Sequence, residues 1–350
     1  MEQEYKYMVA TRCFTFNHAP YIEDAMNGFA MQETSFPVVT LIVDDASTDG
    51  EPEVIRKYLA EHFQSPYRVE ETEYANIICA KHKTNANCDF VVFLLKYNHY
   101  SIKKPKLPYL SEWNDKAKYH ALCEGDDYWI DPYKLQKQVD FLENNSEYIL
   151  VHSDFAAFNN SKNIFIHHAA RKYKIYNGDV FEHLFEKCFI RTPTVLHRNI
   201  PKEIPIQCEP EDMFKGDLYL FYWLSKKGKF YFMDEEMAVY RVLENSASHF
   251  TSEEARYIAF EKGRKLDYFI ADYYGVDSVI KEKLDAKWFV IDLKSCVRTG
   301  NCDYLQKLSS PNDFVQLKYV ILYKCCKFPF FLNFVKLLNE YKKFLYKKWF

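Results

Sequence analysis

The sequence predicts an α/β protein with a mainly parallel central sheet, followed by a helical C-terminal region. In the first half of the chain, short apolar runs alternate with helical patterns, which is typical of consecutive βαβ units. The run Val38–Val43 is β-branched and apolar, as expected of a strand covered on both faces. From about residue 251 onward the pattern is nearly all helical.

The first elements follow from local patterns. Met8–Phe14 is expected to form a strand, and Ala19-Pro20 to open a helix that runs to about Met31. Val38–Val43 is the next strand. It ends at a turn-rich acidic stretch, residues 44–50, which leads into a helix over residues 51–63.

The middle of the chain is harder to assign. A strand is expected over Asp89–Tyr97, and the basic, proline-containing segment Lys103–Pro108 is expected to be a loop. Tyr119–Cys123 predicts a short strand that ends at the acidic stretch Glu124–Asp127. Asp131-Pro132 predicts a helix start, with Asp as N-cap and Pro in the first turn.

Beyond residue 150 the pattern predicts further short elements. Strands are expected at 148–155, 194–198, 229–233 and 237–242, and helices at 179–187 and 214–227.

Composition narrows the class of protein. Apolar residues make up 48% of the 350 residues, so a sizeable core can be buried. Only 9 glycines are present, and neither GxGxxG nor GxxxxGK[ST] occurs, which argues against a dinucleotide or P-loop site. The 10 cysteines show no CxxC spacing, which favours free thiols in a reducing compartment. With no signal-peptide pattern and no long apolar span, we expect a cytoplasmic protein.

Charge is distributed unevenly along the chain. Residues 314–350 contain eight Lys and one Glu, a local net of +7, whereas the whole chain has −3. A basic, aromatic tail on an acidic body indicates an anionic surface as the partner of the tail. Nucleic acid is not expected as a partner, because the acidic body would repel it.

Two pairs of acidic residues each follow a predicted strand. Asp44-Asp45 follows one strand and Asp126-Asp127 follows another. In open α/β sheets, ligands bind beyond the carboxyl ends of the strands. Hard oxygen ligands suit Mg²⁺ or Mn²⁺ bridged to substrate phosphates. Turns are also rich in Asp for local hydrogen bonding, so Asp44-Asp45 taken alone leaves both interpretations open.

Four motifs together resemble those of family 2 glycosyltransferases, which are inverting enzymes of the GT-A fold. Val9–Asn17 is similar to the family's first strand and turn, and Leu41–Gly50 to its V-D-D-x-S-x-D-G segment. Cys123–Trp129 with the following helix resembles its metal-binding acidic motif. Gly216-Asp217-Leu218 and Ala238–Arg241 resemble the acceptor-side block. The resemblance covers about residues 6–250 and implies a GT-A-like catalytic domain over 1–250, with a helical region over 251–350.

The resemblance also implies roles for individual residues. Asp45 would hydrogen-bond the base of a nucleotide-sugar donor, and Phe14, Thr15 and Phe16 would line that pocket. Asp127, with Asp126 beside it, would hold a divalent metal, Mn²⁺ or Mg²⁺, on the donor diphosphate.

The acceptor side has its own set of implied residues. Asp217 matches the position of the catalytic base, and Tyr240 and Arg241 match a loop that approaches the diphosphate. The implied reaction is inverting transfer of a sugar to a hydroxyl of a glycan or lipid-linked acceptor.

One departure from the family keeps other functions open. Many relatives have His two residues after the Y-R arginine, where this chain has Leu243. A non-catalytic relative that binds a nucleotide-sugar or glycan therefore stays an alternative. A sugar-1-phosphate nucleotidyltransferase is a weaker one, because the first strand ends in Phe14–Asn17 rather than in a glycine-rich loop.

The basic tail also has two interpretations. Its lysines and apolar side chains would suit the anionic cytoplasmic face of a membrane, as a peripheral contact. Alternatively, its apolar stripe packs on the rest of the protein with the lysines outward.

Overall fold

The computed structural model describes residues 4–200, 216–243, 252–299, 310–328 and 330–331. The chain forms two compact units, each assembled from separate segments. The first comprises Met1–Phe181, Phe189–Gln207 and Leu220–Ser246; the second comprises Glu182–Cys188, Cys208–Tyr219 and Ala247–Phe350. The domain boundary near residue 250 stays a prediction.

The first unit is built on one large mixed sheet, in which 11 strands among the described residues are joined by backbone hydrogen bonds. In chain order they are β1 (Tyr7–Thr15), β2 (Val38–Asp44), β3 (Arg68–Glu71), β4 (Ala75–Lys81), β5 (Cys88–Leu95), β6 (Ala117–Leu122), β7 (Tyr128–Trp129), β8 (Tyr148–Asn159), β9 (Ile164–Ile166), β10 (Leu196–Arg198) and β11 (Lys229–Val242). Their spatial order is β3-β4-β5-β2-β1-β6-β10-β8-β11-β7, with β9 beside β8.

The centre of the sheet is parallel, as expected. Strands β5, β2, β1 and β6 all run in the same direction, and β8 and β11 form a second parallel pair. Every residue of β2 and of β5 is buried, because both faces of these strands are covered. The α/β fold with a parallel central sheet is therefore confirmed.

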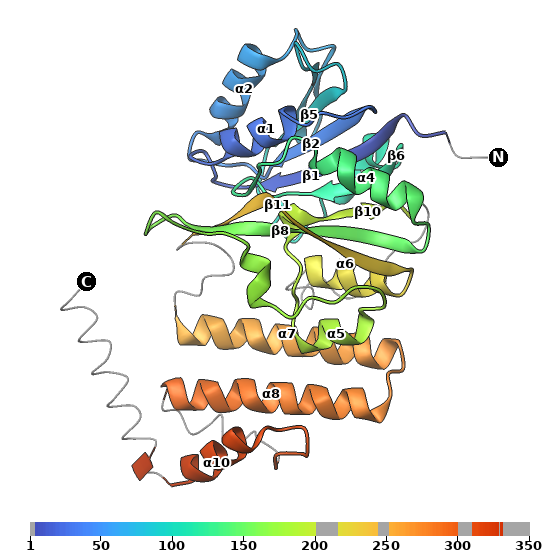
Figure 1. Cartoon of the computed structure of the whole chain (residues 1–350). Helices are drawn as coiled ribbons and strands as arrows, with labels where there is room; N and C mark the ends of the chain where they lie inside the picture. The colour runs from blue at the N-terminus through green and yellow to red at the C-terminus, as the bar shows by residue number, and fades with distance from the viewer. Residues whose placement is uncertain (1–3, 201–215, 244–251, 300–309, 329, 332–350) are drawn as a thin grey trace. The chain divides into compact units, whose positions relative to one another are not determined.

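Both faces of the sheet are covered by the helices that connect its strands (Figure 1). Helices α1 (Ile22–Ala30), α2 (Glu51–His62) and α4 (Lys134–Asn144) share one apolar core with the strands. On the opposite face, η1 (Leu107–Leu110) and α3 (Ser111–Asn114) contribute Leu110 and Trp113 to a second core. The apolar stripes of α1, α2 and α4 thus point at the sheet, as the spacing of their apolar residues predicts.

Two helices begin later than the sequence predicts. Helix α1 begins at Ile22, because Pro20 lies in a turn whose His18 carbonyl accepts the Tyr21 and Ile22 N–H groups at 2.8 and 2.9 Å. Helix α4 begins at Lys134 rather than at Pro132. Asp131 caps the preceding turn instead, where its Oδ1 accepts the Tyr133 N–H at 2.8 Å.

The strands differ from prediction in two places. The segments expected at 229–233 and 237–242 form the single strand β11, interrupted by a bulge between Met233 and Ala238 that the charged residues occupy. The hairpin β3–β4 is not predicted from the sequence, because β3 is half exposed and carries three charged residues in four.

The second unit is helical, which confirms the prediction for the C-terminal region. Helix α7 (Glu253–Tyr273) starts at Ser252, whose hydroxyl accepts the Ala255 N–H at 3.0 Å. Helix α8 (Ser278–Thr299) packs on α10 (Leu317–Cys326) through a shared apolar core. Four described elements remain. They are the 3-10 turns η2 (Ala169–Lys172) and η3 (Thr192–Thr194) and the helices α5 (Phe181–Glu186) and α6 (Gly216–Ser225). None of the described helices is long and apolar enough to cross a bilayer.

Replacing Gly28 by Ala is expected to destabilise the first unit. A Cβ atom at Gly28 would lie 2.8 Å from the backbone nitrogen of Trp129, so α1 and β7 would have to separate. Such overpacking costs about 1–3 kcal/mol, measured as the free energy of unfolding in urea. Gly263→Ala in α7 is the matched control, since its Cβ would meet Trp288 at an ordinary 3.5 Å and the helix favours Ala. Equal effects of the two substitutions would contradict this account.

Candidate active site

The predicted site residues of the first unit gather where the parallel strands end. In the β1–β2 pairing Thr15 lies opposite Asp44, and in the β1–β6 pairing Arg12 lies opposite Leu122. The acidic loop that follows β6 then turns back over the end of β1. There the Gly125 N–H donates to the Phe14 carbonyl at 3.2 Å. The V-D-D segment and the acidic motif are therefore brought to one edge of the sheet.

The contact between Gly125 and Thr15 is too close for any side chain at position 125. An added Cβ would lie 2.1 Å from Thr15 Oγ1. Thr15 is buried and its hydroxyl donates to Glu51 Oε1. Glycine at this position thus sets the height of the acidic loop above β1, which no spacing argument predicts.

Glu51 is a central residue of the site that the sequence analysis does not select. It is fully buried at the start of α2, and its Oε2 accepts the His18 N–H at 2.8 Å and the Ser47 hydroxyl at 2.9 Å. One carboxylate thereby joins the end of β1, the turn after it and the turn after β2. The positive N-terminus of α2 favours this buried charge. A glutamate directly after the D-x-S-x-D-G segment is the only sequence feature that points to it.

Asp44 is also buried, at 1% exposure. Its Oδ2 accepts the Ser47 N–H at 3.3 Å, whereas its Oδ1 has no hydrogen-bond partner among the described residues. Burial raises the pKa of Asp44 to about 6, and the nearby carboxylates of Glu51 and Asp45 add to the rise. Asp44 is therefore an incompletely satisfied acceptor at the centre of the strand ends.

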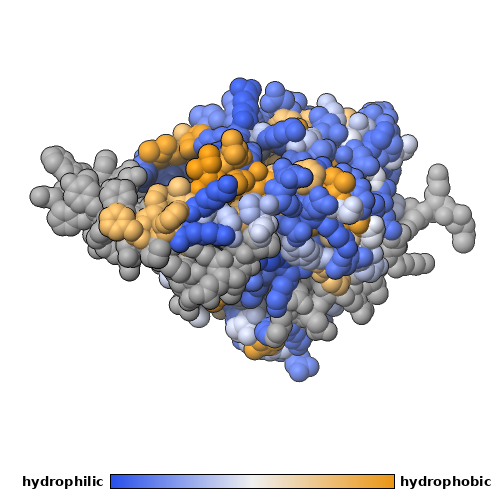
Figure 2. Space-filling model, turned by 90° about the horizontal axis from the view of Figure 1, so that it is seen from below, coloured by the Kyte–Doolittle hydropathy of each residue, from blue (hydrophilic) through white to orange (hydrophobic). Residues whose placement is uncertain are grey.

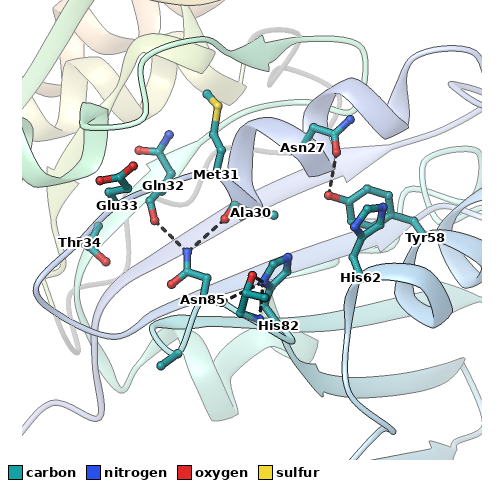
Figure 3. A pocket seen from close by; sticks show the side chains of 12 residues that line it. Asn27, Ala30, Met31, Gln32, Glu33, Thr34, Tyr58, His62, His82 and Asn85 are labelled. Carbon is teal, nitrogen blue, oxygen red and sulfur yellow. Dashed lines mark hydrogen bonds between the residues drawn. The ribbon is translucent and has the colours of Figure 1, made fainter.

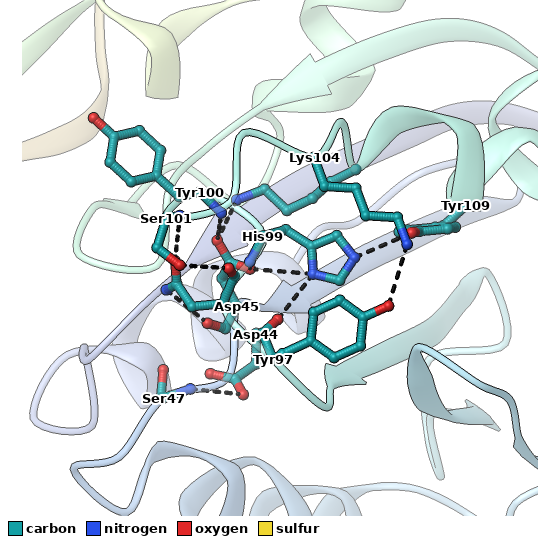
Figure 4. Close-up of polar contacts among 11 residues, drawn as sticks. Asp44, Asp45, Ser47, Tyr97, His99, Tyr100, Ser101, Lys104 and Tyr109 are labelled. Carbon is teal, nitrogen blue, oxygen red and sulfur yellow. Dashed lines mark hydrogen bonds and ion pairs between the residues drawn. The ribbon is translucent and has the colours of Figure 1, made fainter.

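Asp45 lies under the loop that follows β5 (Figure 4). Its carboxylate is 1% exposed and accepts the His99 N–H at 2.7 Å, the Tyr100 N–H at 3.1 Å and the Lys106 ammonium at 2.7 Å. The His99 ring is itself fully buried and stacks on Tyr97. The basic segment is thus folded onto Asp45; it is a loop, as predicted, as far as Lys106, and its last two residues, Leu107 and Pro108, belong to η1.

The predicted nucleotide pocket has aromatic walls. The Lys106 ammonium lies 5.5 Å from the centre of the Phe14 ring, and Phe14 is half-buried. Phe16, the residue after β1, is exposed at 43%. Phe14 and Asp45 therefore share Lys106, and the Asp45 N–H donates to the Thr15 carbonyl at 3.0 Å, whereas the Thr15 hydroxyl points away from Phe14 toward Glu51.

Asp127 and Arg241 connect the acidic motif to the last strand of the sheet. The β11–β7 pairing brings the Arg241 N–H to Asp127 Oδ1 at 2.7 Å. The Arg241 guanidinium donates to the Asp126 carbonyl at 2.9 Å and forms an ion pair with Asp24. The rings of Tyr21 and Tyr128 lie 5.0 and 4.6 Å from it.

Negative charge at the acidic motif is poorly compensated. Asp127 is buried, and burial raises its pKa well above the ordinary value, with Asp126 and Glu124 adding to the rise. Asp126 is partly exposed, and His18 Nε2 lies 4.0 Å from its carboxylate. Adjacent carboxylates with this surplus of negative charge fit a hard divalent cation, which would relieve their repulsion. Asp126 and Asp127 therefore fit the metal that the resemblance implies.

A second group of residues could also hold a metal ion. Ligand atoms of Asp154, His168 and Asp234 lie within 4.8 Å of one another. A hydrogen bond already joins two of the three residues, because Asp154 Oδ2 accepts His168 Nδ1 at 2.9 Å, and Asp154 Oδ1 accepts the Ala170 N–H at 3.0 Å. The sequence shows no metal spacing at His167-His168, since the three residues come from β8, the turn before η2 and the bulge of β11.

The two remaining predicted residues lie on α6 and β11. Tyr240 precedes Arg241, and its ring lies 5.5 Å from the Arg191 guanidinium. Asp217 is the second residue of α6, is exposed, and belongs to the second unit. Leu243 follows β11 and is half-buried, and His249 lies outside the described residues.

A cavity of about 680 Å³ lies at the opposite end of β2 and β5 from Asp44 (Figure 3). It is lined by the ends of α1 and α2 and by the turn 82–86. Asn85 Nδ2 donates to the Ala30 and Gln32 carbonyls there, at 3.1 and 2.9 Å. None of the predicted site residues lines this cavity.

Comparison with known proteins gives distant similarities. No protein-family model matches the chain. Uncharacterized proteins of Mycobacterium bovis and Mycobacterium tuberculosis are 29% identical over 232 residues, which is 65% of this chain. The chain matches 56% of the length of these relatives.

Solved structures with a similar arrangement include two glycosyltransferases. Staphylococcus aureus TarS 1–349 in complex with UDP-GlcNAc is 13% identical, with 96% of this chain and 91% of that chain covered and a TM-score of 0.45. The mannosyltransferase PcManGT from Pyrobaculum calidifontis, in complex with GDP-Man and Mn²⁺, is 13% identical, with 97% and 88% covered and a TM-score of 0.41. At this distance the similarity assigns no activity to this chain.

Substituting Glu51 tests whether it organises the site. In Glu51→Gln an amide NH₂ would face buried donors, so the free energy of unfolding is expected to fall by about 2 kcal/mol. Glu53→Gln is the matched control, because Glu53 is exposed in the same turn of α2. Urea unfolding monitored by circular dichroism measures both. No difference between the two variants would show that Glu51 is not the connecting residue.

The raised pKa of Asp44 predicts a pH-dependent stability. A carboxyl whose pKa is raised on folding stabilises the protein below its unfolded pKa, and this contribution is lost as the pH rises through about 6. Asp44→Asn is therefore expected to gain about 1–1.5 kcal/mol of stability over wild type between about pH 5 and about pH 7.5, because roughly half of the contribution is already lost below pH 5. Unfolding at both pH values, with the exposed Asp115→Asn as control, measures the effect. A pH-independent difference would contradict it.

Proposed function

We propose that this chain is a metal-assisted, inverting glycosyltransferase of family 2 that uses a nucleoside-diphosphate-sugar donor. The observation that carries the proposal is the meeting of two acidic segments at the carboxyl edge of the parallel strands. Asp44-Asp45 and Asp126-Asp127 lie there with aromatic residues on one side and Arg241 on the other. Nucleotides bind at this edge of open α/β sheets.

The nucleoside would bind at the end of β1. Phe14 and Phe16 offer ring faces for the base and ribose, and Thr15 lies at the bottom of the pocket. A carboxylate has about four acceptor positions, and Asp45 uses three of them for the loop after β5. The fourth acceptor position would bind an N–H group of the base, and because Asp45 is 1% exposed this requires the loop after β5 to move aside.

Asp127 and Asp126 would hold the divalent metal, Mn²⁺ or Mg²⁺, against the donor diphosphate. When bound, the metal neutralises charge on the departing diphosphate. Arg241 keeps Asp127 in place through its main-chain N–H and the Asp126 carbonyl through its guanidinium. Arg241 therefore acts first by positioning the acidic motif, whereas the Tyr240 side chain lies on the opposite face of β11, beside Phe155 and Arg191.

Asp217 would act as the general base on the acceptor, a glycan or lipid-linked glycan. Its carboxylate takes the proton of the attacking hydroxyl while the hydroxyl oxygen bonds to the anomeric carbon. The bond from that carbon to the phosphate oxygen breaks, and its electron pair leaves with the nucleoside diphosphate. A single displacement of this kind inverts the anomeric configuration.

Leu243 favours one alternative, a relative that binds a nucleotide-sugar or glycan without turnover. An apolar, half-buried side chain at this position cannot contact a metal or a phosphate through a polar group. A sugar-1-phosphate nucleotidyltransferase has less support, because β1 ends in an aromatic turn and not in a glycine-rich phosphate loop.

A nucleotide screen tests the donor site. Stabilisation by one of UDP, GDP, CMP or dTDP, dependent on Mn²⁺ or Mg²⁺, is expected as a rise in melting temperature, because the ligand binds only the folded state. Asp127→Asn is expected to abolish the metal-dependent part. The exposed Asp179→Asn is the matched control and should respond as wild type does. Absence of any shift at millimolar ligand with folded protein would refute the donor site.

Donor hydrolysis separates an enzyme from a binder. Asp217→Asn is expected to lower the rate of sugar release by about 10²- to 10⁴-fold, the usual contribution of a general base, while the melting-temperature shift with nucleotide and metal persists. Release of nucleoside diphosphate measures the rate. Nucleotide binding without hydrolysis in wild type, or equal rates in both proteins, would favour the non-catalytic alternative.

A further inference from the structure

Helix α10 presents an apolar stripe to solvent. Leu317 and Ile321 are separated by four residues and therefore lie on one helix face, and they are 73% and 53% exposed. Phe328 continues the stripe in the turn after the helix and is 68% exposed. Isolated exposed apolar residues are ordinary, but three along one stripe of a single helix indicate a contact surface.

The stripe is not simply the outer surface of a poorly packed helix. The opposite side of α10 is well buried, since Tyr323 and Cys326 pack with Phe289 and Leu293 of α8. The helix is thus apolar on both sides, and only one side has a partner within the described residues. This explains why the helix shows almost no amphipathic pattern in its sequence.

Lysines surround the exposed stripe. Lys318 and Lys327 flank it and Lys324 lies within it, and all three are exposed. No acidic residue occurs between Phe314 and Phe331, and none of the three lysines has a carboxylate partner among the described residues. Figure 2 shows apolar side chains gathered beside strongly hydrophilic ones.

We propose that this α10 stripe (Leu317, Ile321 and Phe328 with Lys318, Lys324 and Lys327) binds the surface of an anionic phospholipid bilayer. Apolar side chains would enter the boundary between headgroups and acyl chains, while the lysines reach outward to the phosphates. Each lysine near an anionic surface adds attraction, and no nearby carboxylate within the described part of the helix opposes it. The inference is independent of the proposed chemistry, and it would hold a glycosyltransferase beside lipid-linked acceptors.

A protein partner fits this surface less well. The centres of protein interfaces are depleted in lysine, whereas Lys324 lies inside the stripe. Lys318 and Lys327 lie on either side of the exposed apolar residues, where long basic side chains can reach anionic headgroups while the apolar residues enter the bilayer boundary.

Vesicle sedimentation of the whole 350-residue chain tests the proposal. Wild type is expected to sediment with vesicles of mixed phosphatidylcholine and phosphatidylglycerol, less at high salt, and not with phosphatidylcholine alone. The triple variant Lys318→Gln, Lys324→Gln, Lys327→Gln should partition on the order of a hundredfold more weakly. Lys57→Gln, Lys116→Gln, Lys283→Gln is the matched control, because it removes three exposed lysines elsewhere and should bind as wild type does.

The remaining outcomes identify other occupants of the stripe and would overturn the proposal. Vesicle binding that the α10 triple variant retains would place the contact elsewhere on the chain. A concentration-dependent dimer that Phe328→Ser disrupts without lipid would assign the stripe to a second copy. A fall in melting temperature for Phe328→Ser, with no vesicle binding by wild type, would show that the chain's own residues cover it. The lysine variants change only exposed side chains, so they test vesicle binding even if Phe328→Ser misfolds.

Discussion

The close approach of Gly125 to Thr15 is the constraint on which the site depends. Because position 125 is glycine, the acidic loop packs directly on Thr15 at the end of β1. The Thr15 hydroxyl in turn donates a hydrogen bond to Glu51. Glu51 in turn binds the His18 N–H and the Ser47 hydroxyl, which belong to the turns after β1 and β2. Three loops that are far apart in sequence are therefore held at one height above the sheet by one glycine, one hydroxyl and one carboxylate.

The same arrangement of loops places carboxylates close together and thereby shifts their pKa values. Carboxylates that meet at the strand ends raise one another's pKa, as at Asp127, and they also add to the rise that burial causes in the pKa of the Cys13 thiol beneath them. The fold tolerates this repulsion through two compensations. Arg241 donates to Asp127 and to the Asp126 carbonyl, and the loop after β5 supplies Lys106 to Asp45. The strand ends thus carry a cluster of carboxylates with two ion-paired cations beside it, Lys106 on Asp45 and Arg241 on Asp24.

Much of the fold can be predicted because parallel strands carry a strong local pattern. Val38–Val43 is apolar because β2 is covered on both faces, and the acidic stretches after β2 and β6 mark where strands end. The hairpin β3–β4 cannot be predicted in this way, because β3 is half exposed and its residues show no alternation of apolar and polar side chains. Pro20 and Pro132 predict helix starts that are too early, because the turn before each helix uses proline as readily as the first helical turn does.

The sequence by itself determined the central strands, the helices that follow them and the residue types at their ends, because hydrophobic period and turn chemistry are local properties of the chain. It also selected Asp45, Asp127 and Arg241 by motif. Only the tertiary structure decided that Glu51 joins the loops, that Asp45 is covered by the loop after β5, and that Leu317 and Ile321 face solvent. Burial and hydrogen-bond partners depend on segments distant in sequence, and for that reason no local pattern specifies them.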